Sequence, residues 1–189
     1  MGEGREESGV GGAITRRDER ALVRGAQAGS VEALEALYRR HWRRSRRAAY
    51  LIVNDAAASE DIAQEAFLAA VRALDRFDRR RPFGPWLHRI VVNRAIDWAR
   101  RRTLRGEVEA VDSNPDGELA GSSPAPSRPL GDDVAAALRA LPPEQRALIV
   151  LRYLLEYTPG EIAAMLDLPR GTVNSRLRRG LDRLKEALG

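Results

Sequence analysis

Apolar residues recur at intervals of three and four along most of this 189-residue chain. That spacing places them on one face of an α-helix. We find no stretch with the strict alternation of apolar and polar residues that is typical of a half-buried strand. The pattern therefore predicts an all-α fold. The predicted helices cover about residues 19–28, 31–53, 60–76, 84–104, 132–140, 143–156, 159–166 and 172–188.

The helical pattern is missing from two segments, and these set the predicted domains. Residues 1–18 are rich in glycine and charged residues, which predicts a disordered N-terminal tail. Residues 106–131 are rich in Gly, Ser, Pro and acidic residues, and a flexible coil of that length spans roughly 25–30 Å root-mean-square. We therefore expect two small helical domains, residues 19–105 and 132–189, joined by a flexible acidic linker.

Charge differs between these segments. Residues 21–105 carry eighteen basic and nine acidic side chains, whereas residues 106–131 carry one and five. This asymmetry indicates separate roles for the basic domain and the acidic linker. Of the 32 basic residues 31 are arginine. Arginine binds phosphates and guanine edges bidentately, although GC-rich coding favours it as well.

The composition also excludes several kinds of chemistry. The chain has no cysteine, so it can form neither disulfides nor thiolate zinc sites. Its two histidines, His41 and His88, make a histidine metal site unexpected, and we expect no metal and no cofactor. No apolar run is long enough to span a membrane, and the N-terminus lacks the apolar core of a signal peptide. We expect a cytoplasmic protein without membrane insertion.

The last thirty residues carry the strongest motif. Residues 158–161, Thr-Pro-Gly-Glu, have the pattern of a helix start with a capping box, and residues 167–171 interrupt the helix that follows. The next helix is expected to bury one stripe and to present basic and polar residues on the other side. The stripe contains Val173, Leu177, Leu181, Leu184 and Leu188, and the outward face contains Ser175, Arg176, Arg179 and Arg183. This pattern favours a DNA-binding helix-turn-helix; the alternative is a helical hairpin with a solvated basic face.

The predicted helix 60–76 has a polar outer face. Ser59 is expected to cap it, and Ile62, Ala63, Ala66, Phe67, Ala70, Val71 and Leu74 to form its buried stripe. The outer face contains Asp61, Gln64, Glu65, Leu68 and Arg72. A leucine among acidic residues fits a docking surface for a partner, but a solvated face is the more common explanation.

The predicted helix 84–104 has a face suited to nucleic acid. Trp86, Arg89, Asn93, Asp97 and Arg100 recur on it, opposite Leu87, Val91, Ala95 and Trp98. A basic loop at residues 78–82 precedes the helix and lies between Phe77 and Phe83. Arginines with aromatic residues suit unstacked single-stranded bases. The alternative places Trp86, Phe77 and Phe83 in the core and pairs Asp97 with Arg100 or Arg101 along the helix.

Six arginines surround Trp42 on the predicted helix 31–53. Spacing alone makes them a basic helical face, which we interpret as solvated surface, with long-range contact to DNA phosphates as the alternative. They are Arg39, Arg40, Arg43, Arg44, Arg46 and Arg47.

Taken in order, these motifs resemble a bacterial RNA polymerase sigma factor of the extracytoplasmic-function (ECF) type. Residues 61–67 (DIAQEAF) are similar to the core-binding motif of region 2.2, and residues 83–90 (FGPWLHRI) to regions 2.3 and 2.4. Residues 141–146 (LPPEQR) and 171–176 (GTVNSR) are similar to region 4. The resemblance covers residues 20–188. One departure is Asp167, where the family usually has glycine in the helix-turn-helix turn.

The resemblance implies a role for each group of residues. Asp61, Gln64, Glu65 and Leu68 would dock on the largest polymerase subunit. The minus-10 element would be recognised and melted by Asp78, Arg79, Arg80, Arg81, Trp86, Arg89, Asn93, Asp97 and Arg100. The minus-35 duplex would be read by Arg170, Thr172, Asn174, Ser175, Arg176 and Arg179.

The partners implied by the resemblance are the two large subunits of core RNA polymerase, promoter DNA in duplex and single-stranded form, and an anti-sigma factor. The protein would not be an enzyme. One alternative is a stand-alone helix-turn-helix regulator that binds duplex DNA without polymerase, but we see no sequence for a dimer face or ligand pocket. A DNA-processing enzyme would need a metal-binding carboxylate cluster or an activated nucleophile.

Overall fold

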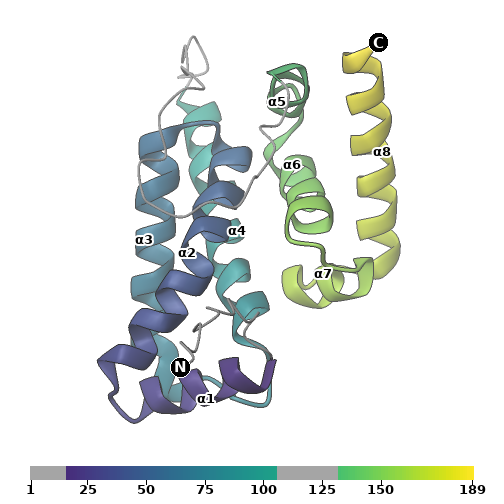
Figure 1. Cartoon of the computed structure of the whole chain (residues 1–189). Helices are drawn as coiled ribbons and strands as arrows, with labels where there is room; N and C mark the ends of the chain where they lie inside the picture. Colours follow the sequence, from purple (N-terminus) through teal and green to yellow (C-terminus); the bar gives the residue numbers. More distant parts are fainter. Residues whose placement is uncertain (1–15, 106–131) are drawn as a thin grey trace, which may run out of the picture.

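The computed structural model describes residues 16–105 and 132–189, and every element in these two ranges is a helix (Figure 1). The all-α prediction is therefore confirmed for the described part of the chain. The helices form two groups, which we call the first module (residues 16–105) and the second module (residues 132–189). The predicted linker and most of the predicted tail lie outside the described residues.

The first module is a bundle in which α2 packs against α1, α3 and α4. Its core includes Leu37, Ile52, Leu87 and Val91, all fully buried. Its elements are α1 (Arg16–Gln27), α2 (Val31–Val53), α3 (Ala56–Ala73), the short 3₁₀ helix η1 (Leu74–Arg76) and α4 (Phe83–Leu104).

The second module packs three helices against the long helix α8. Leu148, Leu151, Ile162 and Val173 form the centre of its core. Its elements are α5 (Asp132–Arg139), α6 (Pro143–Ile149), the π-helical turn η2 (Val150–Leu154), α7 (Pro159–Leu166) and α8 (Arg170–Leu188).

Two helix starts differ from the sequence prediction by three residues or more. Helix α3 begins at Ala56 because Asp55 caps it: its Oδ1 accepts a hydrogen bond from the Ala58 N–H at 2.9 Å. Ser59, the predicted cap, is buried inside the helix and donates to the Ala56 carbonyl at 2.7 Å. Alanine is the best helix former, so residues 56–58 extend the helix back to the first residue able to cap it.

Helix α1 begins at Arg16, so residues 16–18 of the predicted tail are helical. The predicted helix 143–156 is also interrupted. It becomes a π-helical turn after Ile149, where the Leu155 N–H bonds to the Val150 carbonyl at 3.0 Å, and the backbone turns at Glu156, whose φ is +64°.

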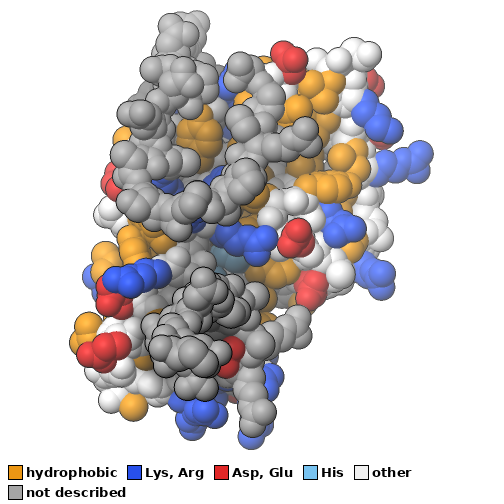
Figure 2. Space-filling view, viewed as in Figure 1, with side chains coloured by type: hydrophobic (Ala, Val, Ile, Leu, Met, Phe, Trp, Pro, Cys, Tyr) orange, Lys and Arg blue, Asp and Glu red, His pale blue; other side chains and the backbone are white. Residues whose placement is uncertain are grey.

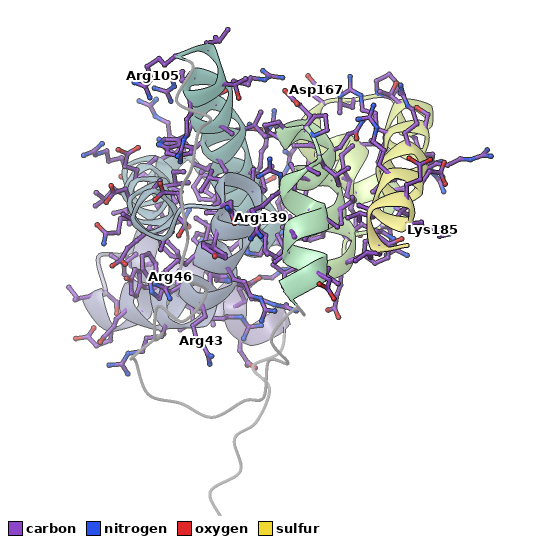
Figure 3. The ribbon with its side chains drawn as sticks, turned by 90° about the horizontal axis from the view of Figure 1, so that it is seen from above. Arg43, Arg46, Arg105, Arg139, Asp167 and Lys185 are labelled. Carbon is purple, nitrogen blue, oxygen red and sulfur yellow. The ribbon has the colours of Figure 1, made fainter. Side chains whose placement is uncertain are left out.

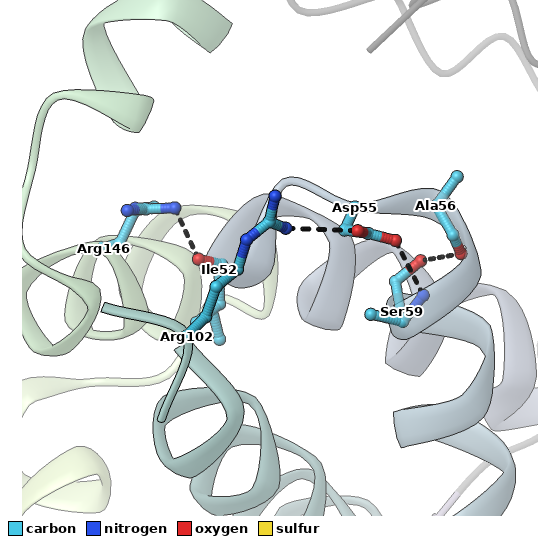
Figure 4. A network of polar contacts seen from close by, with 7 residues as sticks. Ile52, Asp55, Ala56, Ser59, Arg102 and Arg146 are labelled. Atoms are coloured by element: carbon cyan, nitrogen blue, oxygen red, sulfur yellow. Dashed lines mark hydrogen bonds and ion pairs between the residues drawn. The ribbon is translucent and has the colours of Figure 1, made fainter. Parts of the chain in front are cut away.

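The two modules pack against one another through α6, which contacts α2 and α4, and through α7, which contacts α4. Arg146 of α6 lies in this contact with only 8% of its surface exposed. Its guanidinium donates to the Ile52 carbonyl in the last turn of α2 at 2.5 Å (Figure 4). It also donates to the Leu141 carbonyl at 3.0 Å. Carbonyls at a helix C-terminus lack partners within the helix, so Arg146 caps α2 from the other module.

Candidate nucleic-acid interface

The second module contains the predicted helix-turn-helix. The capping box at the start of α7 is present: Thr158 Oγ1 accepts from the Glu161 N–H at 3.3 Å, and the Glu161 carboxylate accepts from the Thr158 N–H at 2.8 Å. Asp167 ends α7 in the left-handed conformation, with φ +56°. The turn therefore has the geometry that glycine usually supplies, with aspartate in its place.

Helix α8 buries a stripe against the second module that differs in part from the prediction. Val173 and Leu177 are buried, Leu181 and Leu184 are half-buried, and Leu188 is exposed. Gly180 is also buried, and a Cβ at that position would lie 3.1 Å from Ile149 Cδ1. Helices α6 and α8 therefore approach closely at Gly180, where a larger side chain would need Ile149 to move.

The residues predicted to read the minus-35 element lie in the N-terminal half of α8. Four are exposed, namely Arg170, Asn174, Ser175 and Arg179, and two are half-buried, namely Thr172 and Arg176. Basic side chains project along the edge formed by α8 (Figure 2), and Lys185 lies at its outer side (Figure 3). Arg183 instead points back to its own module, where it donates to Gln145 Oε1 at 3.1 Å.

Helix α4 presents the predicted polar face. Arg89, Asn93, Asp97 and Arg100 are exposed, and the opposite residues Leu87, Val91 and Ala95 are fully buried while Trp98 is half-buried. This arrangement exposes Arg89 and Asn93 on the surface of the helix, while Arg100 is paired with Glu144 of the second module.

Trp86 packs against its own module more closely than a residue that only stacks on unpaired bases would. It is half-buried, with its ring centroid 4.5 Å from that of Phe77 and 5.6 Å from that of Phe83. Phe77 and Phe83 are buried, as the alternative reading of this segment proposed. These three aromatic residues fix both ends of the basic loop.

Asp78 shapes that basic loop. Its Oδ1 accepts from the Arg80 N–H at 2.9 Å, and its carbonyl accepts from the Arg81 N–H at 2.9 Å. Arg79, Arg80 and Arg81 are all exposed. The carboxylate therefore stabilises a turn that presents three guanidinium groups.

The predicted docking residues Asp61, Gln64, Glu65 and Leu68 are all exposed on α3, and Leu68 keeps 54% of its surface exposed. Val71, expected in the core, is 40% exposed. The exposed apolar surface of the module also includes Tyr38 on α2, which stacks on Trp42 with centroids 4.9 Å apart. The sequence reading missed Tyr38 because its contact with α3 depends on how the two helices pack.

The arginine cluster around Trp42 is largely engaged by carboxylates. Four of its six members form ion pairs: Arg39 with Glu35, Arg40 with Glu19, Arg44 with Glu156 and Arg46 with Glu60. Arg46 and Arg43 lie on the first module, far from α8 (Figure 3). Because of these ion pairs, fewer guanidinium groups of the cluster are available to bind phosphates than its sequence suggests.

A buried polar network that the sequence did not predict lies between α1, α2, α4 and the loop before α7. His41 Nε2 and Glu19 Oε1 are 2.8 Å apart, and the hydrogen bond with His41 holds the pKa of Glu19 below its usual value despite burial. His88 Nδ1 lies 2.6 Å from the Tyr157 hydroxyl of the second module. Burial, reinforced by His41 and Arg44, lowers the pKa of His88 to about 3, so its ring is neutral at pH 7.

A further contact between the modules joins α4 to α6. Arg100 Nε donates to Glu144 Oε1 at 2.6 Å, beside a cavity of about 350 Å³ that Arg176 and Arg179 also line. The sequence reading assigned no role to Glu144. Its position opposite Arg100 depends on the packing of α6 against α4, which local patterns do not encode.

Within the described residues, no three His, Cys, Asp or Glu side chains are grouped so as to hold a metal ion. In the same ranges, no helix is both long and apolar enough to cross a membrane.

Comparison with known families defines the class of protein. Residues 37–105 match the family Sigma-70 region 2, and residues 131–184 match Sigma-70, region 4. The two modules are thus the two conserved regions of a sigma factor.

Individual relatives show which kind of sigma factor the chain resembles. The chain is 34% identical to the ECF RNA polymerase sigma factor SigM of Mycobacterium tuberculosis, over 96% of this chain and 89% of that relative. It is 33% identical to SigW of Bacillus subtilis, over 74% and 80%. It is 36% identical to SigE of Mycolicibacterium smegmatis over 84% of this chain, and it spans 63% of that relative. The chain belongs to the family of ECF RNA polymerase sigma factors.

Solved structures show the same fold. The structure of CnrH in complex with the cytosolic domain of CnrY matches with a TM-score of 0.68 and 30% identity, over 90% of this chain and 96% of that one. The sigma factor RpoE of Bartonella quintana, in complex with the anti-sigma factor NepR, matches with a TM-score of 0.66 and 26% identity, over 84% and 98%.

Proposed function

We propose that this chain binds core RNA polymerase and directs it to promoters by recognising a minus-35 duplex and a melted minus-10 element. The observation that carries the proposal is the pairing of two DNA-facing helices in one chain. Helix α4 presents Arg89, Asn93 and Arg100, and helix α8 presents Asn174 and Arg179, each above a buried apolar stripe. This is the arrangement expected of a protein that contacts two separate stretches of DNA.

Helix α4 and the loop before it would recognise and melt the minus-10 element. Unpaired bases bind only after they leave the duplex, so holding them lowers the free energy of the open promoter and removes the need for ATP. Stacking or hydrogen bonding of each captured base contributes about 1–3 kcal/mol, and a few such bases offset local melting. The exposed guanidinium groups of Arg79, Arg80 and Arg81 would hold the backbone of the parted strand.

The start of α8 would recognise the minus-35 duplex. Arg170, Thr172, Asn174, Ser175, Arg176 and Arg179 would enter the major groove, where an arginine bonded to a guanine edge contributes about 1–3 kcal/mol of discrimination. Ser175 already donates its hydroxyl to the Thr172 carbonyl at 3.0 Å, so it is better placed to accept than to donate.

Polymerase would bind the outer face of α3 through Asp61, Gln64, Glu65 and Leu68. The related structures are described with the cytosolic domain of CnrY and with the anti-sigma factor NepR. We therefore propose an anti-sigma factor as a further partner. A protein with these partners acts in the cytoplasm and needs no catalytic activity of its own.

Run-off transcription with core polymerase tests the proposal. Addition of the chain should give specific start sites on genomic DNA, and mapping those sites should reveal a shared minus-35 and minus-10 sequence. If core polymerase gains no start-site selectivity, the proposal is wrong. The regulator alternative would show instead as tight, palindrome-dependent binding by the chain alone in a gel shift.

Arg176→Ala gives a finer test of the minus-35 assignment. It should weaken recognition of this element by about 1–3 kcal/mol and leave polymerase binding intact. Transcription from promoters with intact and scrambled minus-35 sequences measures this directly. Equal output of the unaltered protein from the two promoters would remove the basis for the assignment.

A further inference from the structure

Helix α1 holds the chain on both sides of the basic loop and within it. Where the chain enters the loop, Gln27 Nε2 donates to the carbonyls of Leu74 and Phe77, at 2.9 and 3.0 Å. Within the loop, Arg20 Nη2 donates to the Arg80 carbonyl at 3.3 Å. Both side chains bind backbone carbonyls, so they fix the course of the loop without engaging the arginine side chains that it exposes.

The third contact of α1 lies where the loop ends and α4 begins. Pro82 precedes the helix and supplies no side-chain cap. The Glu19 carboxylate accepts a hydrogen bond from the Phe83 N–H instead. This N–H group is one of those at a helix start that have no partner within the helix, and the helix dipole favours a negative charge there. Glu19 therefore caps α4 from another helix.

Helix α1 is in turn anchored to α2. Val23 is buried in the core with 2% of its surface exposed. The Glu19 Oε1 that serves α4 lies 2.8 Å from His41 Nε2 and 3.5 Å from Arg40 Nε. The start of α4 packs on the same histidine, since a Cβ at Gly84 would lie 3.1 Å from His41 Cε1. Helix α1 thus connects the loop to the centre of the first module.

Under the proposed function, on which this inference rests, the loop and α4 hold the parted strand of the minus-10 element. Such a surface discriminates between sequences only if its groups are held in position by their neighbours. We propose that α1 positions the loop for this task and that Gln27 is the main positioning residue. Gln27 is uncharged and half-buried, and its amide donates to two backbone carbonyls, so it acts through the loop and not on DNA.

The first test uses Gln27→Met, which keeps the length of the side chain but cannot donate to either carbonyl. Run-off transcription with core polymerase compares a mapped promoter with a copy whose minus-10 element is scrambled. The ratio of the two yields should fall about 3- to 10-fold, because two hydrogen bonds to the backbone beside the loop are lost. The corresponding ratio for a scrambled minus-35 element should not change. A variant that is only less stable lowers every yield alike and changes neither ratio.

Two exposed arginines of α1 provide a charge-matched pair of variants. Arg20→Gln removes the bond to the Arg80 carbonyl, whereas Arg24→Gln removes the same charge one turn further along the helix. Both variants should fold as the wild type does, because substitutions at exposed positions cost little. Arg20→Gln should lower the minus-10 ratio about 1.5- to 3-fold, as expected for one exposed hydrogen bond, and Arg24→Gln should leave it unchanged.

Salt dependence distinguishes positioning from direct contact with DNA. The assay measures how the chain with core polymerase binds a single-stranded oligonucleotide that carries the minus-10 sequence. Loss of one phosphate contact reduces the slope of log affinity against log salt by about 0.7. Arg20→Gln should weaken binding and keep the slope of the wild type. A reduced slope would make Arg20 a DNA contact and overturn its positioning role.

Two further results would overturn the inference: an unchanged minus-10 ratio in Gln27→Met, or equal minus-10 ratios in Arg20→Gln and Arg24→Gln. Failure of the proposed function looks different, because the wild type itself would then show no preference for the intact minus-10 element. A clear preference of the wild type, together with either result, leaves the sigma-factor function standing and removes only the role of α1.

Discussion

At the scale of single residues, backbone conformation at one turn decides how α7 and α8 meet. Asp167 has φ +56° and ψ +45°, a left-handed conformation that glycine adopts without steric cost and that side chains with a Cβ adopt at a cost. The sequence predicted an unusual turn here, because the resemblance to the family implies that glycine usually occupies this position. The structure shows that the turn is kept and that aspartate accepts its strain.

The stability of variants at Asp167 should therefore follow how easily each residue adopts the left-handed backbone conformation. Asp167→Ala should lower the free energy of unfolding by about 1 kcal/mol, because alanine cannot bond locally to offset the left-handed conformation, and Asp167→Gly should equal or exceed the wild type. Urea unfolding of the two variants measures this. As a control, Ala164→Gly inside α7 should cost about 0.5–1 kcal/mol. An Asp167→Gly loss as large as that of the control would contradict the prediction.

His88 should make stability depend on pH. Burial lowers its folded pKa to about 3, while its unfolded value is about 6.5, so below pH 6.5 the unfolded chain binds a proton that the folded chain does not. Stability is therefore fully present above pH 6.5 and falls as the pH drops towards 3. At pH 5 the loss should be about 2 kcal/mol relative to pH 7.5.

Urea titrations of the wild type and His88→Gln at pH 7.5, 6.5, 5.5 and 5.0 test this. The difference between their free energies of unfolding should shrink as the pH falls through that range. The lowered pKa of Glu19 acts below its usual value of 4.5, outside the window measured. Parallel curves for the two proteins would show that His88 does not couple folding to protons.

At the scale of helices, the sequence predicted which face of each helix is buried better than where each helix begins. The spacing of Leu87, Val91 and Ala95 placed the core side of α4 correctly, because burial follows the helical period. The start of α3 was wrong because Asp55 and Ser59 can each cap a helix, and only the favourable run of alanines between them decides which one does. Gly180 was missed because its role is the approach of α6.

The exposed face of α4 leads to a prediction for Asn93. If Asn93 binds an unpaired base, Asn93→Ala should reduce initiation on fully paired promoters more than on templates melted beforehand, since only the former need the captured base to offset melting. Comparing transcript yields from matched paired and bubble templates measures this. An equal defect on the two templates would assign Asn93 a structural role; its exposure argues against that role.

At the scale of the whole molecule, the sequence predicted two helical groups but not how they pack together. Arg146 appeared only as part of a motif, and its burial against the Ile52 carbonyl depends on residues 94 positions apart. The pairs Arg100 with Glu144 and His88 with Tyr157 are equally remote in sequence. Local periodicity carries no information on such contacts. The exposure of most candidate DNA-binding and docking residues could be predicted, because it depends on which face of a helix is polar.

The outer position of α3 leads to the last prediction. Helix α3 packs against α2, α4 and η1 and lies on the side of the first module away from the second (Figure 1). Polymerase can therefore dock there without displacing the second module. Leu68→Arg should weaken binding to core polymerase at least tenfold, about 1.4 kcal/mol, by placing a charge in the centre of that surface. The thermal stability of the free chain should not change, because Leu68 is 54% exposed.

Val31→Arg is the matched control: the same substitution at an apolar residue that is 72% exposed at the start of α2, outside the predicted docking face. It should bind polymerase as the wild type does. An equal loss of polymerase binding in Leu68→Arg and Val31→Arg would contradict the docking role of Leu68.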